Sequence, residues 1–214
     1  MYSEFKNVEQ VLARYPLQIE RVYFLPDTLV ELPAELLTTL RFNLENQAET
    51  ESEAFYEEAF IFPLLQWAWM RYPQLKLWSH RLLRYDDILC GEPDYWVAAK
   101  PMGVVQSLSS RPLLIVVEAK RQDFEASWGQ CLAEMLACQR INKDKELTVF
   151  GMVSTGLIWE FGKLQGERFI RHPLAYGLTE PARLAGNVDF MFAESAKQLV
   201  LLFNQSSQSQ RKLD

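Results

Sequence analysis

The sequence predicts a mixed α/β fold, in which helices pack on a central β-sheet. Helical patterns come first, three strand-like segments follow between residues 76 and 120, and one helix, further strands and a closing helix complete the chain. At 214 residues, of which 49% are hydrophobic, the chain has the size and composition of a globular α/β protein rather than a disordered one.

The N-terminal elements form an extension, residues 1–45, that we expect to pack on the core. Residues 4–14 carry apolar side chains at helical spacing, which predicts a short helix. Residues 17–32 favour one or two short extended segments. Pro33 suits the first turn of a helix that ends near Asn46, because proline is tolerated where no N–H donor is needed.

The stretch 50–71 is the most apolar helix candidate. Its acidic start suits a helix N-terminus, and Pro63 is expected to kink it. The second half is apolar on nearly every side, so we expect it to be buried or to face a partner. The acids at its start are Glu51, Glu53, Glu57 and Glu58.

Three strands follow, with the sequences LKLWSHRLLRY, PDYWVAA and RPLLIVVEAK. The continuous apolar run Leu113–Val117 is typical of a strand that is covered on both faces. MGVVQSLSS, between the last two strands, has the composition of a loop.

The remaining elements complete a main domain over residues 46–203. Apolar residues at three and four spacing predict a helix over 124–140, and LTVFGMVST and GLIWEFGKL predict two strands. FIRHP is a further short strand candidate, and residues 188–203 predict a closing amphipathic helix. The polar segment 204–214 has little to bury, so we expect a mobile tail.

Charge and cysteine content limit the functional classes. The formal net charge of −6 argues against attraction of nucleic acid by the whole surface, so phosphate binding would need a local basic patch or a bound metal ion. The three cysteines do not form a disulfide framework, and Cys131 and Cys138 have helical rather than zinc-site spacing. We see no signal segment and no stretch that could span a bilayer, which favours the cytoplasm and no membrane partner.

Three residues carry the chemistry that the sequence suggests. Glu118 and Lys120 lie two positions apart at the end of a buried strand and therefore share one face, whereas Ala119 faces the other. Asp94 begins the preceding strand, so it can converge with Glu118 if the strands are neighbours. Two close carboxylates and the main-chain carbonyl of Ala119 would suit Mg²⁺ or Mn²⁺.

At these residues the sequence resembles the PD-(D/E)XK nuclease superfamily, also called restriction-endonuclease-like. EPDYW matches the first acid of the motif, and VEAK matches the second acid and the lysine. The resemblance includes the acidic helix before them, the helix after them and the strand pair FGMVSTGLIWEF, and it spans about residues 50–165.

This resemblance implies a restriction-endonuclease-like mixed central sheet flanked by helices, and a metal-dependent nuclease that hydrolyses phosphodiester bonds in DNA. It implies metal ligation by Asp94 and Glu118, and a charge-stabilising or water-positioning role for Lys120. It adds Gln130 as a catalytic residue on the following helix. It also implies an acid from the first helix, for which we choose Glu57 over Glu53 and Glu58.

Each of these residues also has a simpler interpretation. Asp94 could start a turn, Glu118 and Lys120 could form a surface ion pair, and Gln130 could be a solvated helix residue. His80 and His172 are interpreted as structural or exposed. A phosphate-binding rim around the site could be formed by Arg81, Arg84, Lys100, Arg121 and Arg140. Alternatively, these side chains simply lie on a solvated surface. Core packing is favoured over base stacking for Trp67, Trp69 and Trp78.

A second functional hypothesis keeps the fold but not the reaction. In it, the chain is a catalytically idle module that binds nucleic acid or a protein partner as a homodimer. The acidic net charge and the apolar stretch 59–70 motivate it, because an exposed apolar helix face would mark a dimer interface.

Overall fold

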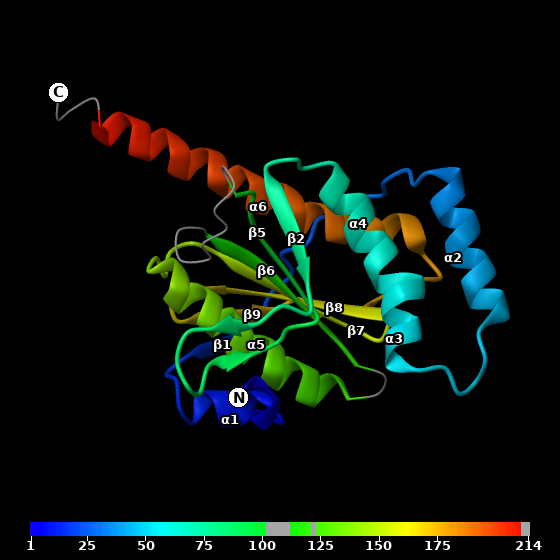
Figure 1. Ribbon diagram of the computed structural model, residues 1–214, viewed down its shortest axis with the longest axis horizontal. Helices are drawn as coiled ribbons and strands as arrows, with labels where there is room; N and C mark the ends of the chain where they lie inside the picture. Colours follow the sequence, from blue (N-terminus) through cyan, green and yellow to red (C-terminus); the bar gives the residue numbers. More distant parts are fainter. Residues whose placement is uncertain (102–111, 121–122, 211–214) are drawn as a thin grey trace.

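The computed structural model describes residues 1–101, 112–120 and 123–210, and helices cover both faces of a large mixed sheet (Figure 1). The sheet has the strand order β1-β9-β8-β7-β6-β5-β2, with β10 paired to β8, and β3 and β4 form a separate ribbon. The predicted mixed α/β sheet flanked by helices is confirmed. The strands are β1 (Gln18–Arg21), β2 (Leu75–Ser79), β3 (Leu83–Arg84), β4 (Cys90–Gly91), β5 (Tyr95–Ala99), β6 (Leu113–Ala119), β7 (Val149–Ser154), β8 (Ile158–Gln165), β9 (Arg168–Arg171) and β10 (Tyr176–Gly177).

Two hydrophobic cores lie on opposite faces of this sheet. Helix α5 (Phe124–Asn142), with α1 (Val8–Leu12) and the 3-10 turn Tyr2–Glu4, covers what we call the α5 face. Helices α2 (Ala34–Asn46), α4 (Phe62–Met70) and α6 (Pro181–Gln210) lie on the other face. Both faces are covered, which explains why Leu113–Val117 is continuously apolar.

The N-terminal segment is part of this architecture. β1 pairs in parallel with β9 at one edge of the sheet, and α1 packs against α5. Further along, the backbone N–H groups of Phe24 and Leu25 donate to Nδ1 of His172, at 3.3 and 3.4 Å. His172 therefore fastens the chain that follows β1, which agrees with the structural role expected for it.

The apolar stretch 50–71 is helical but interrupted. It consists of α3 (Glu53–Tyr56), a π-helical turn η2 (Glu57–Ile61) and α4. Pro63 lies in the first turn of α4 and has no N–H to donate to the carbonyl of Ala59. Asn43 of α2 supplies the missing donor, because its Nδ2 lies 3.1 Å from that carbonyl oxygen.

The apolar residues of this stretch are used inside the molecule. Phe60, Ile61, Leu64 and Leu65 are each 0% exposed and belong to the core beneath α4. The apolar character that suggested a dimer interface is therefore accounted for by core packing, although Met70 at the end of α4 is exposed.

The C-terminal helix is longer than the sequence suggested. α6 continues through Gln210 and projects beyond the sheet (Figure 1), so the predicted bounds of the closing helix, 188–203, were too short, while the mobility of the tail stays a prediction. Val188, Phe192 and Leu199 anchor the helix in the core, and each later residue then needs only to extend an existing helix. Residues 211–214, the predicted loop at 102–110 and Arg111 lie outside the described residues. Among the helices that the structure describes, none combines the length and hydrophobicity needed to cross a bilayer.

Candidate functional site

The start of β5 and the end of β6 meet at one edge of the core. The two strands are antiparallel with Tyr95 opposite Val117, so the residue before β5 lies near the residue that follows Val117. Asp94 occupies that position, and its Oδ2 accepts a hydrogen bond of 2.7 Å from the backbone N–H of Ala119. The structure thus brings Asp94 next to Glu118, as the strand pattern suggested.

Glu118 lies on the α5 face and is 0% exposed. Neither carboxyl oxygen accepts a hydrogen bond from the residues that the structure describes, although Nζ of Lys120 lies 3.6 Å from Oε1. Burial raises the pKa of Glu118 well above its ordinary value, and the carboxyls of Glu134 and Asp94 raise it further, while Lys120 lowers it. A buried carboxyl with so few partners is costly unless a proton or a cation accompanies it.

Lys120 links the buried and open parts of the site. Its Nζ lies 3.4 Å from Oε1 of Glu53 and 3.6 Å from Oε1 of Glu118. Partial burial lowers the pKa of Lys120, but Glu118, Glu53 and Asp94 outweigh burial and hold the pKa above its usual value. Lys120 therefore carries its positive charge at neutral pH and remains partly open to solvent.

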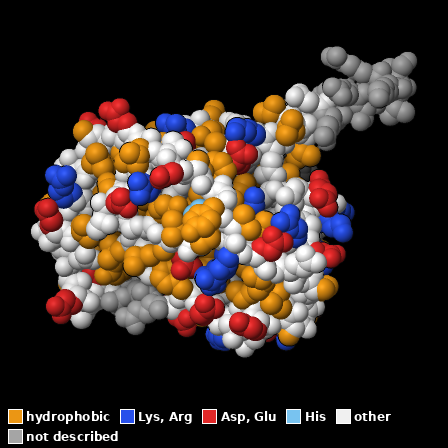
Figure 2. Space-filling view, turned by 180° about the vertical axis from the view of Figure 1, so that it is seen from behind, with side chains coloured by type: hydrophobic (Ala, Val, Ile, Leu, Met, Phe, Trp, Pro, Cys, Tyr) orange, Lys and Arg blue, Asp and Glu red, His pale blue; other side chains and the backbone are white. Residues whose placement is uncertain are grey.

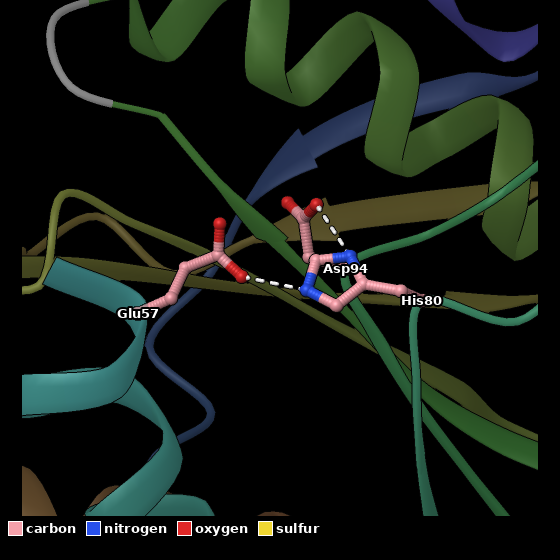
Figure 3. A group of neighbouring side chains, drawn as sticks. All are labelled: Glu57, His80 and Asp94. Carbon is pink, nitrogen blue, oxygen red and sulfur yellow. Dashed lines mark ion pairs between the residues drawn. The ribbon is translucent and has the colours of Figure 1, made fainter. Parts of the chain in front are cut away.

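A second group of side chains lies beside Asp94 (Figure 3). The imidazole of His80 has Nε2 at 3.1 Å from Oε2 of Glu57 and Nδ1 at 3.9 Å from Oδ1 of Asp94. The π-helical turn places Glu57 in the interior, where burial, followed by the Glu57 carboxyl, raises the pKa of Tyr95. Burial raises the pKa of Glu57, Asp94 raises it further, and His80 lowers it.

The three glutamates considered for this position thus lie differently. Glu57 is buried and faces Asp94 across His80, whereas Glu53 is half exposed and contacts Lys120. Glu58 is exposed to solvent. The geometry therefore favours Glu57, and it gives Glu53 a part in holding Lys120.

Helix α5 adds an acid that the sequence analysis did not single out. Glu134 is 0% exposed, and its Oε1 accepts from Nε2 of Gln130 at 3.2 Å. Its Oε2 has no hydrogen-bond partner among the described residues. Burial, followed by Asp94, raises the pKa of Glu134 well above its ordinary value. Gln130 thus touches the acid cluster through Glu134, and its i, i+4 spacing was the available signal.

His80 is exposed, as expected, yet it lies within the cluster. β2 pairs antiparallel with β5, with Ser79 opposite Tyr95, so His80 falls opposite Asp94. Its backbone N–H donates to the carbonyl of Asp94 at 2.9 Å. A histidine directly after the strand that neighbours PDYW was the signal in the sequence.

The donor set fits a divalent cation. Five carboxyl groups lie in the cluster, and the ammonium of Lys120 and the imidazole of His80 contact it. Hard cations with oxygen ligands relieve the repulsion between close carboxylates. Glu57, His80 and Asp94 have ligand atoms within 4.8 Å of one another, whereas ligation by Glu118 and by the Ala119 carbonyl stays a prediction. The five carboxyl groups belong to Glu53, Glu57, Asp94, Glu118 and Glu134.

The predicted basic rim does not gather around this cluster. Arg84 pairs with Asp87, Lys100 lies at the opposite end of β5 from Asp94, and Arg140 lies in the last turn of α5. Arg81 lies nearest in sequence, and its guanidinium covers the ring of Trp78 at 4.4 Å. Arg121 lies outside the described residues.

The tryptophans proposed for base stacking pack in the protein. Trp67 and Trp69 lie against the core beneath α4, and Trp78 stacks on the buried ring of Trp96. On the face shown in Figure 2, basic and acidic side chains are interspersed, so no broad region of one sign covers it.

Comparisons with known proteins identify no family for this chain. A scan against protein-family models and a search of curated proteins both found no match to this chain.

Proposed function

We propose that this chain is a divalent-metal-dependent nuclease that hydrolyses phosphodiester bonds in DNA, on a restriction-endonuclease-like fold. The observation that carries the proposal is the state of Glu118. This carboxyl is fully buried, accepts no hydrogen bond from the described residues, and lies next to Asp94 and Lys120 at the ends of adjacent strands. Lys120, at 3.6 Å, compensates its charge only in part, and a divalent cation would supply the remainder.

In this proposal Asp94, Glu118 and Glu57 hold the metal ion, together with the carbonyl of Ala119. A bound divalent ion would lower the pKa of a water molecule and offset charge on the phosphoryl oxygens. The backbone N–H of Ala119 orients Asp94 through their 2.7 Å hydrogen bond.

Lys120 would act directly on the substrate. Its ammonium is held between Glu53 and Glu118 and remains charged, so it supplies a fixed positive charge beside the scissile phosphate or the attacking water. Gln130 holds Glu134 in place and is the amide nearest to this region on α5.

The test is cleavage of plasmid and single-stranded DNA with Mn²⁺ or Mg²⁺, against EDTA. Lys120→Ala should lower the rate by about 10²–10³-fold, the range found when a preorganised charge-stabilising donor is removed. Lys100→Ala is the matched control, because this exposed lysine lies at the far end of β5. Undiminished cleavage by Lys120→Ala would show that the site is wrongly assigned.

The net charge of −6 favours an alternative hypothesis, in which the chain is a module of the same fold that binds nucleic acid or a protein without cleaving it. This hypothesis predicts that the chain binds DNA or a protein partner and that no cleavage products appear when a divalent metal is added. Light scattering would then show a dimer, whereas a monomer that cleaves DNA with Mn²⁺ would contradict it.

A further inference from the structure

Three side chains from three separate elements converge at the open side of the cluster. Glu57 comes from η2, His80 follows β2, and Asp94 precedes β5, and one ligand atom of each lies within 4.8 Å of the others. Ligands bound at about 2.0–2.2 Å from one ion are separated by roughly 3–4.4 Å. The ion would bind one nitrogen of His80. The short separations of 3.1 Å to Glu57 and 3.9 Å to Asp94 involve different nitrogens, Nε2 and Nδ1, so the 4.8 Å limit is the measure that applies to a single ligand atom.

The position of His80 is fixed by the sheet. Its N–H donates to the carbonyl of Asp94, so the pairing of β2 with β5 extends to this residue. Its φ of 43° lies in the left-handed region that residues other than glycine rarely adopt. The ring, 54% exposed, lies between the carboxyls of Glu57 and Asp94 (Figure 3).

A separate observation indicates a cation here. Glu118 and Glu134 are both 0% exposed, and three of their four carboxyl oxygens have no hydrogen-bond partner among the described residues. Both carboxyls are close enough to Asp94 for its charge to raise their pKa values. Two buried acids with unpartnered oxygens thus lie close to Asp94, and a cation would compensate them once they lose their protons.

From this geometry we infer that His80 is a nitrogen ligand of the metal ion, and that the site selects a first-row transition-metal ion such as Mn²⁺ or Co²⁺ over Mg²⁺. The inference rests on the cation site of the proposed function but not on the reaction. Mg²⁺ favours oxygen ligands and retains its waters, whereas imidazole suits transition-metal ions. The alternative is a protonated His80 that serves only as a counter-ion to Glu57 and Asp94.

The two roles differ in whether a metal–nitrogen bond exists, and this chain is well suited to the measurement. It has only two histidines, His80 and His172. His172 has both ring nitrogens engaged, with Phe24 and Leu25 on Nδ1 and Tyr176 on Nε2. His80→Gln removes the candidate ligand from an exposed position, and His172→Gln is the matched control.

The experiment is pulsed EPR of Mn²⁺ bound to the full chain labelled with ¹⁵N-histidine, together with calorimetric titration of Mn²⁺, Co²⁺ and Mg²⁺. We expect ¹⁵N coupling in the wild type and in His172→Gln, and its loss in His80→Gln. The same substitution should weaken Mn²⁺ and Co²⁺ binding by about 10–100-fold, with a clearly smaller effect on Mg²⁺. If His172→Gln does not fold, the comparison of wild type with His80→Gln carries the test.

A negative result for the His80 inference can be distinguished from a negative result for the proposed function. Mn²⁺ that binds without ¹⁵N coupling makes His80 a counter-ion and overturns the inference, while the proposed oxygen-ligand site stands. Coupling that persists in His80→Gln also overturns it. A wild-type chain that binds no divalent ion overturns both the inference and the proposed function.

Discussion

Replacing Glu134 with glutamine should stabilise the metal-free protein and weaken its response to metal. Glu134→Gln keeps the shape of the side chain and its acceptor for Gln130, and it removes a titratable carboxyl from a site that is 0% exposed. It also removes the neighbour that, after burial, contributes most to raising the pKa of Glu118. Both effects favour the folded state when no cation is present.

The magnitude follows from the proton that glutamine cannot lose. One proton held by the folded chain alone changes stability by about 1.4 kcal/mol per pH unit, so between pH 6 and pH 8 the wild type should lose up to about 2.7 kcal/mol relative to the variant, or about 5–11 °C in Tm. The effect depends on pH with a definite sign. Because the folded-state pKa of Glu134 is raised above the ordinary 4.5, the folded protein holds a proton that the unfolded chain releases. Stability of the metal-free wild type therefore falls as pH rises from about 4.5 through the raised pKa, and the variant should fall less.

The assay is thermal and urea unfolding at pH 6 and pH 8, in EDTA and in Mn²⁺. Glu125→Gln is the matched control, because it lies on the same helix but is exposed, at 64%. Mn²⁺ at about 100 times its Kd should stabilise the wild type by about 2.7 kcal/mol, and the variant by less. A Glu134→Gln protein that is clearly less stable than wild type in EDTA at pH 8 would refute the view that ionisation of this buried carboxyl costs stability.

Two further predictions concern the framework around the site. Asn43→Ala should lower the free energy of unfolding by about 1–3 kcal/mol, because the carbonyl of Ala59 loses its hydrogen-bond donor and Pro63 cannot replace it. Denaturant unfolding measures this loss, with Asn46→Ala, at an exposed position of the same helix, as the control. Equal losses of stability in the two variants would contradict the prediction. Burial lowers the pKa of His172 below 6.5, so its contribution is fully present above pH 6.5 and falls at lower pH, when protonation of Nδ1 removes the acceptor for two backbone N–H groups. The difference in stability between wild type and His172→Gln should therefore shrink from pH 7.5 to pH 5, and a constant difference would argue against this role.

Much of the sheet and part of the candidate site could be predicted from the sequence. The run Leu113–Val117 identified a strand covered on both faces, because alternating side chains of such a strand enter two different cores. The position of Asp94 relative to Glu118 followed from one assumption, that PDYW and VEAK are neighbouring strands. Their antiparallel pairing satisfies it, and the register then places the two acids together.

The remaining features depend on contacts between segments far apart in the chain. Glu134 is one of several polar residues on α5, and only the position of the helix over β6 shows that it is buried near Glu118. His80 looked ordinary because its importance comes from the pairing of β2 with β5. The end of α6 was missed for a different reason: a polar composition does not by itself terminate a helix that is already anchored in the core.

The side chains of the cluster differ in exposure to solvent, and this difference suggests different roles for them. Glu118 and Glu134 are fully buried, so a phosphate group of a polymer cannot reach them directly. Lys120, Glu53 and His80, at 36%, 41% and 54% exposure, form its accessible side. In the proposed nuclease a substrate would approach across this side, and the buried acids would act on it only through the cation that they hold. On this reasoning, substitutions at Lys120 should alter the handling of substrate, whereas substitutions at Glu118 and Glu134 should first alter the affinity for metal.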